Sequence, residues 1–385
     1  MKRPNWFLFI TLGFLLKIFA WFKGQRIVKK VRIKGPAIAL SNHTSFYDFI
    51  YTTAALYPYR VSYLAASKMF YEPLTGFFLR LARAIPKSLM QADPVATKKA
   101  FRILQNGGLV SIFPEGQISP TGTSLEPAFS IAKFIKRAGV DVYLVKHHNA
   151  YLVNPPWSKK TFKGRIETHK ALLMTKNEIK ESSEAVIYEK IMSSLYFSTS
   201  QFNAEKKYKY KLNDIRNLEN VIYQCPKCLH EGLIAHTDRL ICPSCHHEMI
   251  YDTFGRLDQQ GIDDLFFQQR DRLIENIEKD HSYSLKGTCR LQSFRDERLV
   301  EVGQGEISLD QHGYTYHGTI DGKEVSQTFH ISSTPTLPSD IGRNIQIYEG
   351  YQIYQFELDV PYLPTKFVHM GEYLYQKQAK KKDVA

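Results

Sequence analysis

The sequence predicts an α/β protein. Its first domain is expected to hold a mostly parallel sheet flanked by helices, followed by a small cysteine-containing ribbon and a β-rich C-terminal domain that ends in a helix. Apolar runs alternate with helical patterns up to about residue 205, four cysteines are paired between residues 225 and 245, and short alternating strands follow from about residue 287. Regular alternation of strands and helices is typical of a parallel sheet with helices on its faces.

The composition is that of a folded, basic protein. The chain has 385 residues, of which 43% are hydrophobic and 23% are charged, and this length allows two or three domains. Since 51 Lys and Arg stand against 38 Asp and Glu, the net charge is +13. This charge favours anionic partners such as a phospholipid surface, nucleic acid or a phosphorylated substrate. A generally basic soluble protein is the alternative.

Residues 1–24 are expected to form a membrane-associated helix. The apolar run Trp6–Phe22 has 17 residues, which is about 25 Å of helix, whereas the hydrocarbon core of a bilayer is about 30 Å thick. Lys17 interrupts the run, and Trp6 and Trp21 stand at its edges, as interfacial aromatics do. We therefore expect a peripheral or monotopic helix at the cytoplasmic face of the cell membrane. A full span and a buried soluble helix are the alternatives.

Each helix or strand expected between residues 25 and 205 is predicted from a local sequence pattern. Short apolar runs are expected to be buried strands, and longer patterns with apolar residues on one side are expected to be helices. Pro58 stops one helix, and Gly139 ends another. The expected strands are 38–40, 61–65, 109–113 and 140–145, and the expected helices are 48–56, 73–84, 95–104 and 129–138.

His43 and Asp48 follow the first of these strands. Ligands and chemistry collect at strand ends in α/β sheets. If His43 lies in the loop and Asp48 lies in the first turn of the helix, the imidazole can accept a hydroxyl proton while the carboxylate holds its other nitrogen. The alternative is a capping box, in which Ser45 caps the helix and Asp48 takes the third helical position.

A second group of residues, Phe113-Pro114-Glu115-Gly116, follows the strand at 109–113. Pro114 ends the strand, and Gly116 permits a tight turn with exposed amides. Glu115 is then left at the mouth of the sheet. An ordinary turn is the alternative interpretation.

Together the two motifs resemble the glycerophospholipid acyltransferase family, whose best-known members are lysophosphatidate acyltransferases. His43 and Asp48 match its signature of a histidine, four residues and an aspartate. Phe113-Pro114-Glu115-Gly116 matches its second strong block at a family-like distance. The resemblance covers roughly residues 25–200, and both blocks occur in the family's order.

The resemblance implies an enzyme of phospholipid synthesis. It would transfer a fatty acyl group from acyl-CoA or acyl-carrier protein to the hydroxyl of a lysophospholipid, and 1-acyl-glycerol 3-phosphate is the favoured acceptor. His43 would be the general base and Asp48 would orient it. The hydroxyl would attack the thioester directly, without a nucleophilic Ser or Cys. Glu115 and Gly116 would help to shape the acceptor site.

The chain departs from the family pattern where the acceptor phosphate is expected. The family often has Thr-Arg-Ser after Glu-Gly, and here Gln117-Ile118-Ser119 stands instead. Lys68, Arg83 and Lys87 are therefore the candidate phosphate-binding residues, although a lysine lacks the bidentate fork of arginine. Solvated or membrane-facing charges are the alternative interpretation of these residues. Two alternatives stay open: an acyltransferase for a phosphate-free lipid acceptor, and a non-catalytic membrane adaptor that retains the fold.

Four of the five cysteines predict a metal site. Cys225, Cys228, Cys242 and Cys245 form two Cys-x-x-Cys pairs with 13 residues between them, a spacing that suits tetrahedral zinc with four thiolates. Such a site has no open position, which indicates a structural zinc ion in a ribbon-like module. A redox dithiol is the alternative.

The remaining predicted domains follow the acyltransferase domain at 25–205. Residues 206–221 are expected to be a linker, 222–255 the zinc ribbon and 256–385 a β-rich domain. The ribbon or the C-terminal domain could bind a protein partner. Nucleic acid is not expected, since the ribbon lacks a dense basic stripe.

Overall fold

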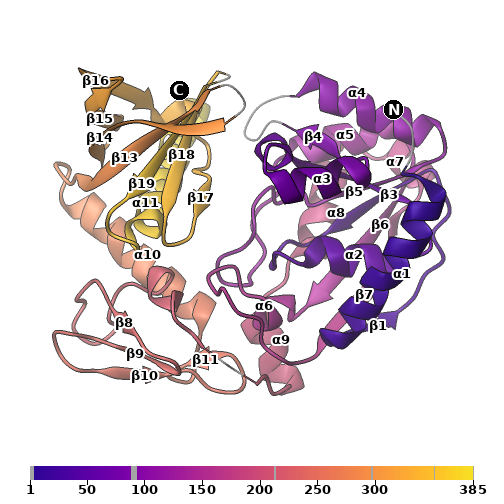
Figure 1. The fold of residues 1–385 in the computed structure, drawn as a ribbon, viewed down its shortest axis with the longest axis horizontal. Coiled ribbons are helices and arrows are strands. Elements are labelled where there is room, and N and C mark those ends of the chain that lie inside the picture. The colour runs from indigo at the N-terminus through magenta and orange to yellow at the C-terminus, as the bar shows by residue number, and fades with distance from the viewer. Residues whose placement is uncertain (1–3, 88–92, 212–213, 296–297, 351, 385) are drawn as a thin grey trace. The chain divides into compact units, whose positions relative to one another are not determined.

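The computed structural model describes residues 4–87, 93–211, 214–295, 298–350 and 352–384. The chain divides into two compact units, which we call unit 1 and unit 2. Unit 1 comprises residues 1–213 and 253–255, and unit 2 comprises residues 214–252 and 256–385. Figure 1 labels the elements of both units.

Unit 1 is built on a mostly parallel sheet, as the sequence predicts. Within the described residues its strand order is β1-β7-β6-β2-β5-β3-β4. All neighbouring strands are parallel except β6 and β7, which form an antiparallel pair. The strands are β1 (Gln25–Lys29), β2 (Ala37–Ser41), β3 (Val61–Ala66), β4 (Ile85–Lys87), β5 (Leu109–Ile112), β6 (Asp141–His148) and β7 (Ile166–Met174).

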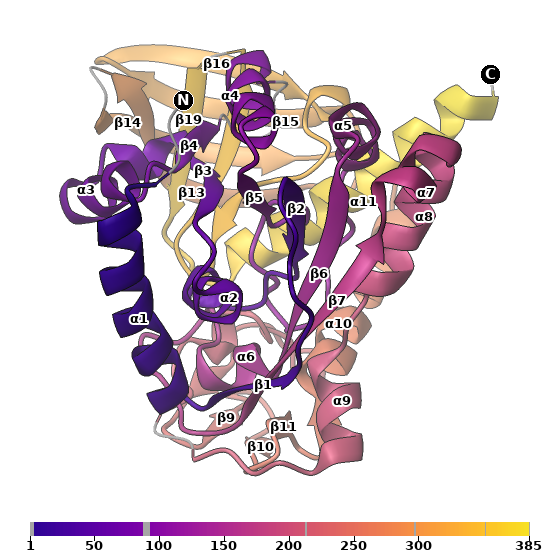
Figure 2. The same ribbon diagram turned by 90° about the vertical axis from the view of Figure 1, so that its right-hand side faces the viewer.

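Helices cover both faces of this sheet (Figure 2). Ile38 and Leu40 of β2 pack in one apolar cluster with α4, α5 and α8, whereas Ala37 and Ala39 pack on the other face with α2. Burial on both faces explains why β2 shows no polar alternation. The helices of unit 1 are α1 (Trp6–Phe22), α2 (Asp48–Leu56), η1 (Ser67–Phe70), α3 (Pro73–Leu81), α4 (Pro94–Gln105), α5 (Ser130–Ala138), α6 (Ala150–Val153), α7 (Lys176–Glu181), α8 (Glu184–Leu195) and α9 (Thr199–Lys206).

Parallel pairing places the carboxyl ends of β6, β2, β5, β3 and β4 at one edge of the sheet. Leu40 of β2 stands opposite Ile112 of β5, and Ala66 of β3 stands opposite Lys87 of β4. The loops that follow β2 and β5 carry the two sequence motifs. The fold therefore brings these motifs to neighbouring positions.

Unit 2 is rich in antiparallel strands. In its described part the larger sheet has the order β16-β15-β14-β13-β19-β18-β17. Phe367 and Met370 of α11 and Leu273 of α10 share one apolar core with this sheet. The elements are η2 (Leu218–Asn220), β8 (Ile234–Ala235), β9 (Arg239–Ile241), β10 (Glu248–Ile250), β11 (Arg256–Leu257), β12 (Gln260–Gly261), α10 (Ile262–Lys279), β13 (Leu285–Arg295), β14 (Arg298–Leu309), β15 (Gly313–Ile320), β16 (Lys323–His330), η3 (Ile331–Ser333), β17 (Ser339–Asp340), β18 (Asn344–Glu349), β19 (Gln352–Leu358) and α11 (Leu363–Val384).

The structure refines the expected elements. The helix expected at 73–84 ends at Leu81, because Arg83 adopts a left-handed conformation (φ 51°) and residues 85–87 form β4. α1 coincides with the apolar run Trp6–Phe22 inside the segment 1–24 that was expected to be helical. Among the described helices, none combines the length and the apolar character needed to cross a bilayer. The finer domain boundaries at 205, 221 and 255 stay predictions.

Candidate active site at the carboxyl edge of the parallel sheet

His43 lies in the loop between β2 and α2, and Asp48 is the first residue of α2. His43 Nδ1 lies 3.1 Å from Asp48 Oδ2. The Asp48 side chain is fully buried, whereas that of His43 is 21% exposed. Since Asp48 accepts the Nδ1 proton, Nε2 of a neutral imidazole is left as the acceptor. The imidazole therefore has one nitrogen oriented by a buried carboxylate.

Main-chain donors hold the Asp48 carboxylate in place. Oδ2 also accepts the N–H groups of Thr44 at 2.6 Å and Ser45 at 2.8 Å. The helix begins at Asp48 with Tyr47 as its N-cap, and Tyr47 makes no side-chain capping bond. The capping box with Ser45 as N-cap is therefore wrong in register, although Asp48 does reach back to the Ser45 amide. This contact holds the Asp48 carboxylate beside His43 Nδ1.

Glu115 joins the second motif to the first. Its buried carboxylate accepts the His43 N–H at Oε1 and the Leu125 N–H at Oε2, both at 3.0 Å. Phe113 stacks on the His43 ring with centroids 4.5 Å apart. Gly116 has φ 73°, a left-handed conformation that favours glycine. The sequence predicted that these residues gather at one edge, but not that Glu115 contacts the main chain of His43.

Burial shifts the pKa values of three groups around this site. Burial raises the pKa of Glu115 to about 8, against the opposing effect of its two amide donors. Burial lowers the pKa of Lys146 to about 8, while the charge of Glu115 acts to raise it. Burial also lowers the pKa of His147 to about 4. The edge of the sheet is therefore a desolvated site with groups that titrate far from their usual range.

Asn42 and His147 brace the site and were not identified from sequence as functional. The Asn42 carboxamide donates to the His147 carbonyl at 2.9 Å and accepts the His147 N–H at 2.8 Å, which ties the end of β2 to β6. The His147 ring lies within 3.0 Å of the hydroxyls of Thr52 and Thr168. In the sequence, this contact was indicated only by the polar residues Ser41 and Asn42, directly after an expected strand.

Lys68 and Lys87 lie at the same edge of the sheet, on the far side of β5 from His43. Lys68 belongs to η1, directly after β3, and Lys87 ends β4. Both side chains are half-buried. Burial lowers the pKa of Lys87, and Asp93 acts to raise it. Ile118, which replaces the arginine of the family pattern, is also half-buried in the loop after Gly116.

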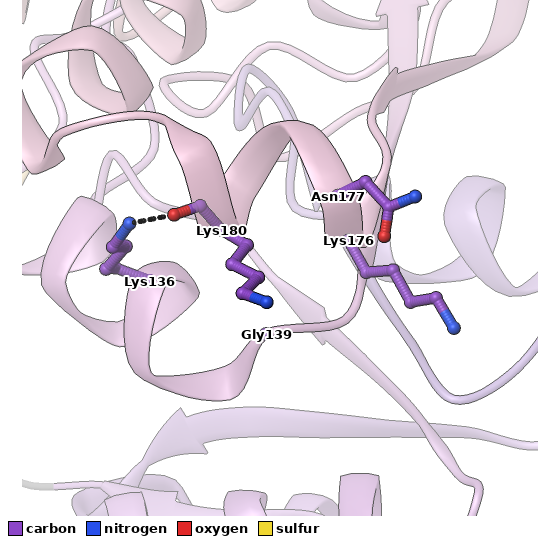
Figure 3. Close-up of a pocket in the computed structure, with 5 residues that line it drawn as sticks. All are labelled: Lys136, Gly139, Lys176, Asn177 and Lys180. Atoms are coloured by element: carbon purple, nitrogen blue, oxygen red, sulfur yellow. Dashed lines mark hydrogen bonds between the residues drawn. The ribbon is translucent and has the colours of Figure 1, made fainter.

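A pocket of about 300 Å³ lies elsewhere in unit 1 (Figure 3). Lys136, Gly139, Lys176, Asn177 and Lys180 line it. These residues adjoin the start of β6 at Asp141, which is the opposite end of that strand from His147. Lys136 Nζ donates to the Lys180 carbonyl at 2.8 Å. This pocket is therefore separate from the candidate active site.

In unit 2 the four predicted metal ligands converge. The Sγ atoms of Cys225, Cys228, Cys242 and Cys245 all lie within 4.8 Å of one another. Cys225 and Cys245 are 3.7 Å apart, and Cys228 and Cys242 are 3.5 Å apart. Zn–S bonds of about 2.3 Å in a tetrahedron require sulfur separations of about 3.8 Å. The four sulfurs therefore fit one zinc ion.

The two cysteine loops have the same main-chain design. Leu229 and His246, each directly after the second cysteine of its pair, are left-handed, with φ 64° and 56°. Each donates its N–H to the carbonyl of the first cysteine of its pair at 3.0 Å. Because both loops have the same turn, the four thiols are better explained as the ligands of one metal site than as an accidental cluster of cysteines.

Comparison with known proteins identifies the first part of the chain. The family model described as Acyltransferase matches residues 22–146, which include His43, Asp48 and Glu115. The matched residues are similar to an acyltransferase-family domain. The family model leaves the cysteine cluster and the rest of unit 2 unmatched.

The chain is similar to two named proteins. One is the 1-acyl-sn-glycerol-3-phosphate acyltransferase of Bacillus subtilis (strain 168), which is 30% identical over 74 residues. That match spans 19% of this chain and 37% of the relative's length. The other is the crystal structure of the 1-acyl-sn-glycerophosphate acyltransferase PlsC from Thermotoga maritima, with a TM-score of 0.41 and 18% identity. It covers 49% of this chain and 78% of the other.

Proposed function

We propose that the protein is an O-acyltransferase that moves a fatty acyl group from acyl-CoA or acyl-carrier protein to the hydroxyl of a lysophospholipid. The observation that carries the proposal is the His43–Asp48 pair, 3.1 Å apart at the edge of the parallel sheet within the region that matches the family model. The acceptor tested first is 1-acyl-glycerol 3-phosphate, because the Bacillus subtilis relative is named for it.

The proposed reaction is a direct transfer. His43 Nε2 takes the proton of the acceptor hydroxyl as the hydroxyl oxygen attacks the thioester carbonyl, and Asp48 stabilises the imidazolium that forms. The tetrahedral intermediate then expels the thiolate, which takes the proton from His43. The products are the new ester and the free thiol, and His43 ends in its starting state.

The residues around His43 agree with a mechanism that has no acyl-enzyme. Ser45 is buried, and its Oγ accepts the Tyr47 N–H at 3.2 Å. All five cysteines lie at or after Cys225, outside the residues that match the family model. The residues that match the family model therefore offer no cysteine nucleophile, in agreement with direct transfer.

The acceptor phosphate is assigned to Lys68 and Lys87. Lys68 follows β3 and Lys87 is the last residue of β4, and the carboxyl ends of both strands lie at the same edge of the sheet as His43. Ile118 offers no charge there. A screen of matched acceptors with and without phosphate tests this assignment. We expect Lys68→Ala and Lys87→Ala to reduce kcat/KM about tenfold for 1-acyl-glycerol 3-phosphate, and to leave a monoacylglycerol unaffected.

Other outcomes of the screen separate the alternatives. Equal or better turnover of the monoacylglycerol by the unmodified protein favours the phosphate-free acceptor. No transfer to any acceptor, with vesicle binding that is unchanged in His43→Ala, favours the non-catalytic membrane adaptor that could bind a protein partner through unit 2.

Membrane association at the cytoplasmic face is part of the proposal. α1 packs on the α2 region, with Phe19 5.9 Å from Tyr47, but exposes many large apolar side chains. Near His43, Phe46 and Phe49 are also exposed. Exposed apolar and aromatic groups beside cations suit an interfacial helix on an anionic lipid surface. The exposed apolar residues of α1 and α3 are Trp6, Phe7, Leu12, Phe14, Leu15, Ile18, Phe19, Trp21, Phe22, Leu74, Phe77 and Phe78.

Vesicle sedimentation tests the membrane proposal. Phe77→Ser with Phe78→Ser, and Trp21→Ser with Phe22→Ser, are expected to weaken binding to phosphatidylglycerol-containing vesicles at least tenfold, because each removes exposed apolar area. Val186→Ser, on the exposed side of α8, is the matched control. Unchanged sedimentation of both double variants would exclude this surface.

We also propose that the cysteine cluster holds one structural zinc ion. Cys225, Cys228, Cys242 and Cys245 would supply four thiolates, and zinc bound in this way would stabilise the fold without taking part in the transfer. Metal analysis of the purified protein is expected to give one zinc per chain. Four rapidly titrating thiols without metal, after purification in the absence of chelator, would refute the site.

A further inference from the structure

Glu115 makes contacts that suit a different task from acceptor binding. It is only 7% exposed, and each of its carboxylate oxygens accepts a main-chain N–H. Oε1 accepts from His43 and Oε2 from Leu125, and these residues belong to different segments of the chain. The carboxylate therefore bridges the two loops at their main chains.

The same loop contacts the main chain of His43 a second time. The Ser119 N–H donates to the His43 carbonyl at 2.8 Å, so the amide and the carbonyl of His43 are both bonded to residues of the loop after β5. Phe113, at the start of this loop, stacks on the imidazole at 4.5 Å. His43 precedes α2 and follows β2, so no helix or strand ladder positions it. These contacts take the place of regular secondary structure.

The loop that holds His43 is itself closed. The Ser119 hydroxyl accepts the Gly122 N–H at 3.0 Å and donates to the Thr123 carbonyl. Glu115 Oε2 then ties the start of the loop to Leu125 at its end. This closed loop contacts His43 through Oε1 of Glu115, the Ser119 amide and the Phe113 ring.

We propose that Glu115 is a positioning residue whose carboxylate holds the main chain of His43 for catalysis and does not contact the acceptor. This inference rests on the proposed acyl transfer for its kinetic part. A displacement of the base by about 1 Å can cost about 10²-fold in rate. Loss of the bridge therefore lowers kcat rather than affinity for the acceptor.

Two substitutions of Glu115 should lower kcat to different extents. Glu115→Gln keeps the shape but replaces one acceptor oxygen by an NH₂ group, so one of the two amides loses its partner. Glu115→Met has a similar length and accepts neither amide. We expect kcat to fall about tenfold in the first and about 10²-fold in the second, with KM for the lysolipid within about threefold of the unmodified value.

A matched control uses Glu126, an exposed carboxylate in the same region that accepts the Tyr188 hydroxyl at 3.0 Å. Glu126→Gln should leave kcat and KM unchanged. A raised KM with unchanged kcat in Glu115→Gln would overturn the inference, since that pattern marks a residue that binds the acceptor.

A second measurement does not need turnover. In protein labelled with ¹⁵N-histidine, the imidazole signals of His43, assigned from the spectrum of His43→Gln, should shift in both Glu115 variants and stay in place in Glu126→Gln. Unshifted His43 signals in folded Glu115→Met would refute positioning. If that variant does not fold, Glu115→Asp, which keeps the carboxyl group but shortens its reach, decides. If the unmodified protein transfers no acyl group, the proposed function fails while these spectra still test the bridge.

Discussion

Unit 1 and unit 2 assemble their informative residues over different lengths of chain. In unit 1 the contact between His43 and Glu115 joins residues 72 positions apart. In unit 2 the first and last cysteines of the cluster, Cys225 and Cys245, are only 20 positions apart. A site formed by short turns can be predicted from the spacing of its residues in the sequence, because the turns themselves set the geometry. A site made at a sheet edge depends on strand order and register.

The largest effect is expected in unit 1 when the acid that orients His43 is removed. Asp48→Ala should lower kcat about 10³-fold, because the imidazolium loses its partner and the amides of Thr44 and Ser45 lose their acceptor. Asp48→Asn keeps the shape and should retain more of the thermal stability. Steady-state kinetics and thermal unfolding of both variants test this, and activity within tenfold of the unmodified level in Asp48→Ala would contradict it.

In unit 2 the corresponding test removes a metal ligand. Cys242→Ser should release zinc and destabilise unit 2 by about 4 kcal/mol, which lowers its unfolding midpoint by roughly 10 °C. Hydrogen exchange should rise in peptides from residues 222–255 and stay unchanged in peptides around His43. Cys289→Ser, a buried cysteine outside the cluster, is the control that should keep the zinc.

Two buried histidines allow a comparison by pH. Burial lowers the pKa of His147 in unit 1 to about 4 and that of His369 in unit 2 to about 3. Because both pKa values are depressed in the fold, their contribution to stability is complete above about pH 6.5 and is lost as the pH falls toward those values. As the pH falls from about 7 to about 5, each histidine should lower the free energy of unfolding of its unit by about 2 kcal/mol.

Substitution should distinguish the two histidines. The ring of His147 contacts two threonine hydroxyls, whereas neither ring nitrogen of His369 has a hydrogen-bond partner among the described residues. His369→Phe should therefore flatten the acid dependence of unit 2 with little loss at neutral pH. His147→Phe should also destabilise unit 1 at neutral pH, as urea unfolding at several pH values would show. Equal losses at neutral pH in the two variants would contradict the comparison.

The smallest expected effect concerns two glycines of unit 1 with left-handed backbone. Gly116 and Gly139 have φ of 73° and 58°, and an added Cβ would meet nothing within 4 Å at either position. Substitution by alanine should lower the free energy of unfolding by about 1 kcal/mol at each position. Only Gly116→Ala should also lower kcat, since Gly116 adjoins Glu115. An equal loss of kcat in Gly139→Ala would argue against a local role for the turn.

The sequence predicted much of unit 1 because its signals are local. The alternation of apolar runs and helical patterns predicted β2, α2, β5 and β6 close to their observed bounds. The sequence did not predict β1 and β7, whose exposed positions break the apolar pattern, or β4, which is only three residues long. Glu115 was placed at the right edge, but its bond to the His43 amide needs the register of β2 against β5.

By itself, the sequence determined the two motifs, the succession of the main strands along the chain and the four cysteines proposed as metal ligands, because each depends on spacing along a short piece of chain. The tertiary structure decided what Glu115 and Asn42 contact, and that Lys68 and Lys87 share an edge with His43. Such contacts depend on which strands pair and in what register, and this is settled by burial of both faces of the sheet rather than by any residue's own neighbours in sequence.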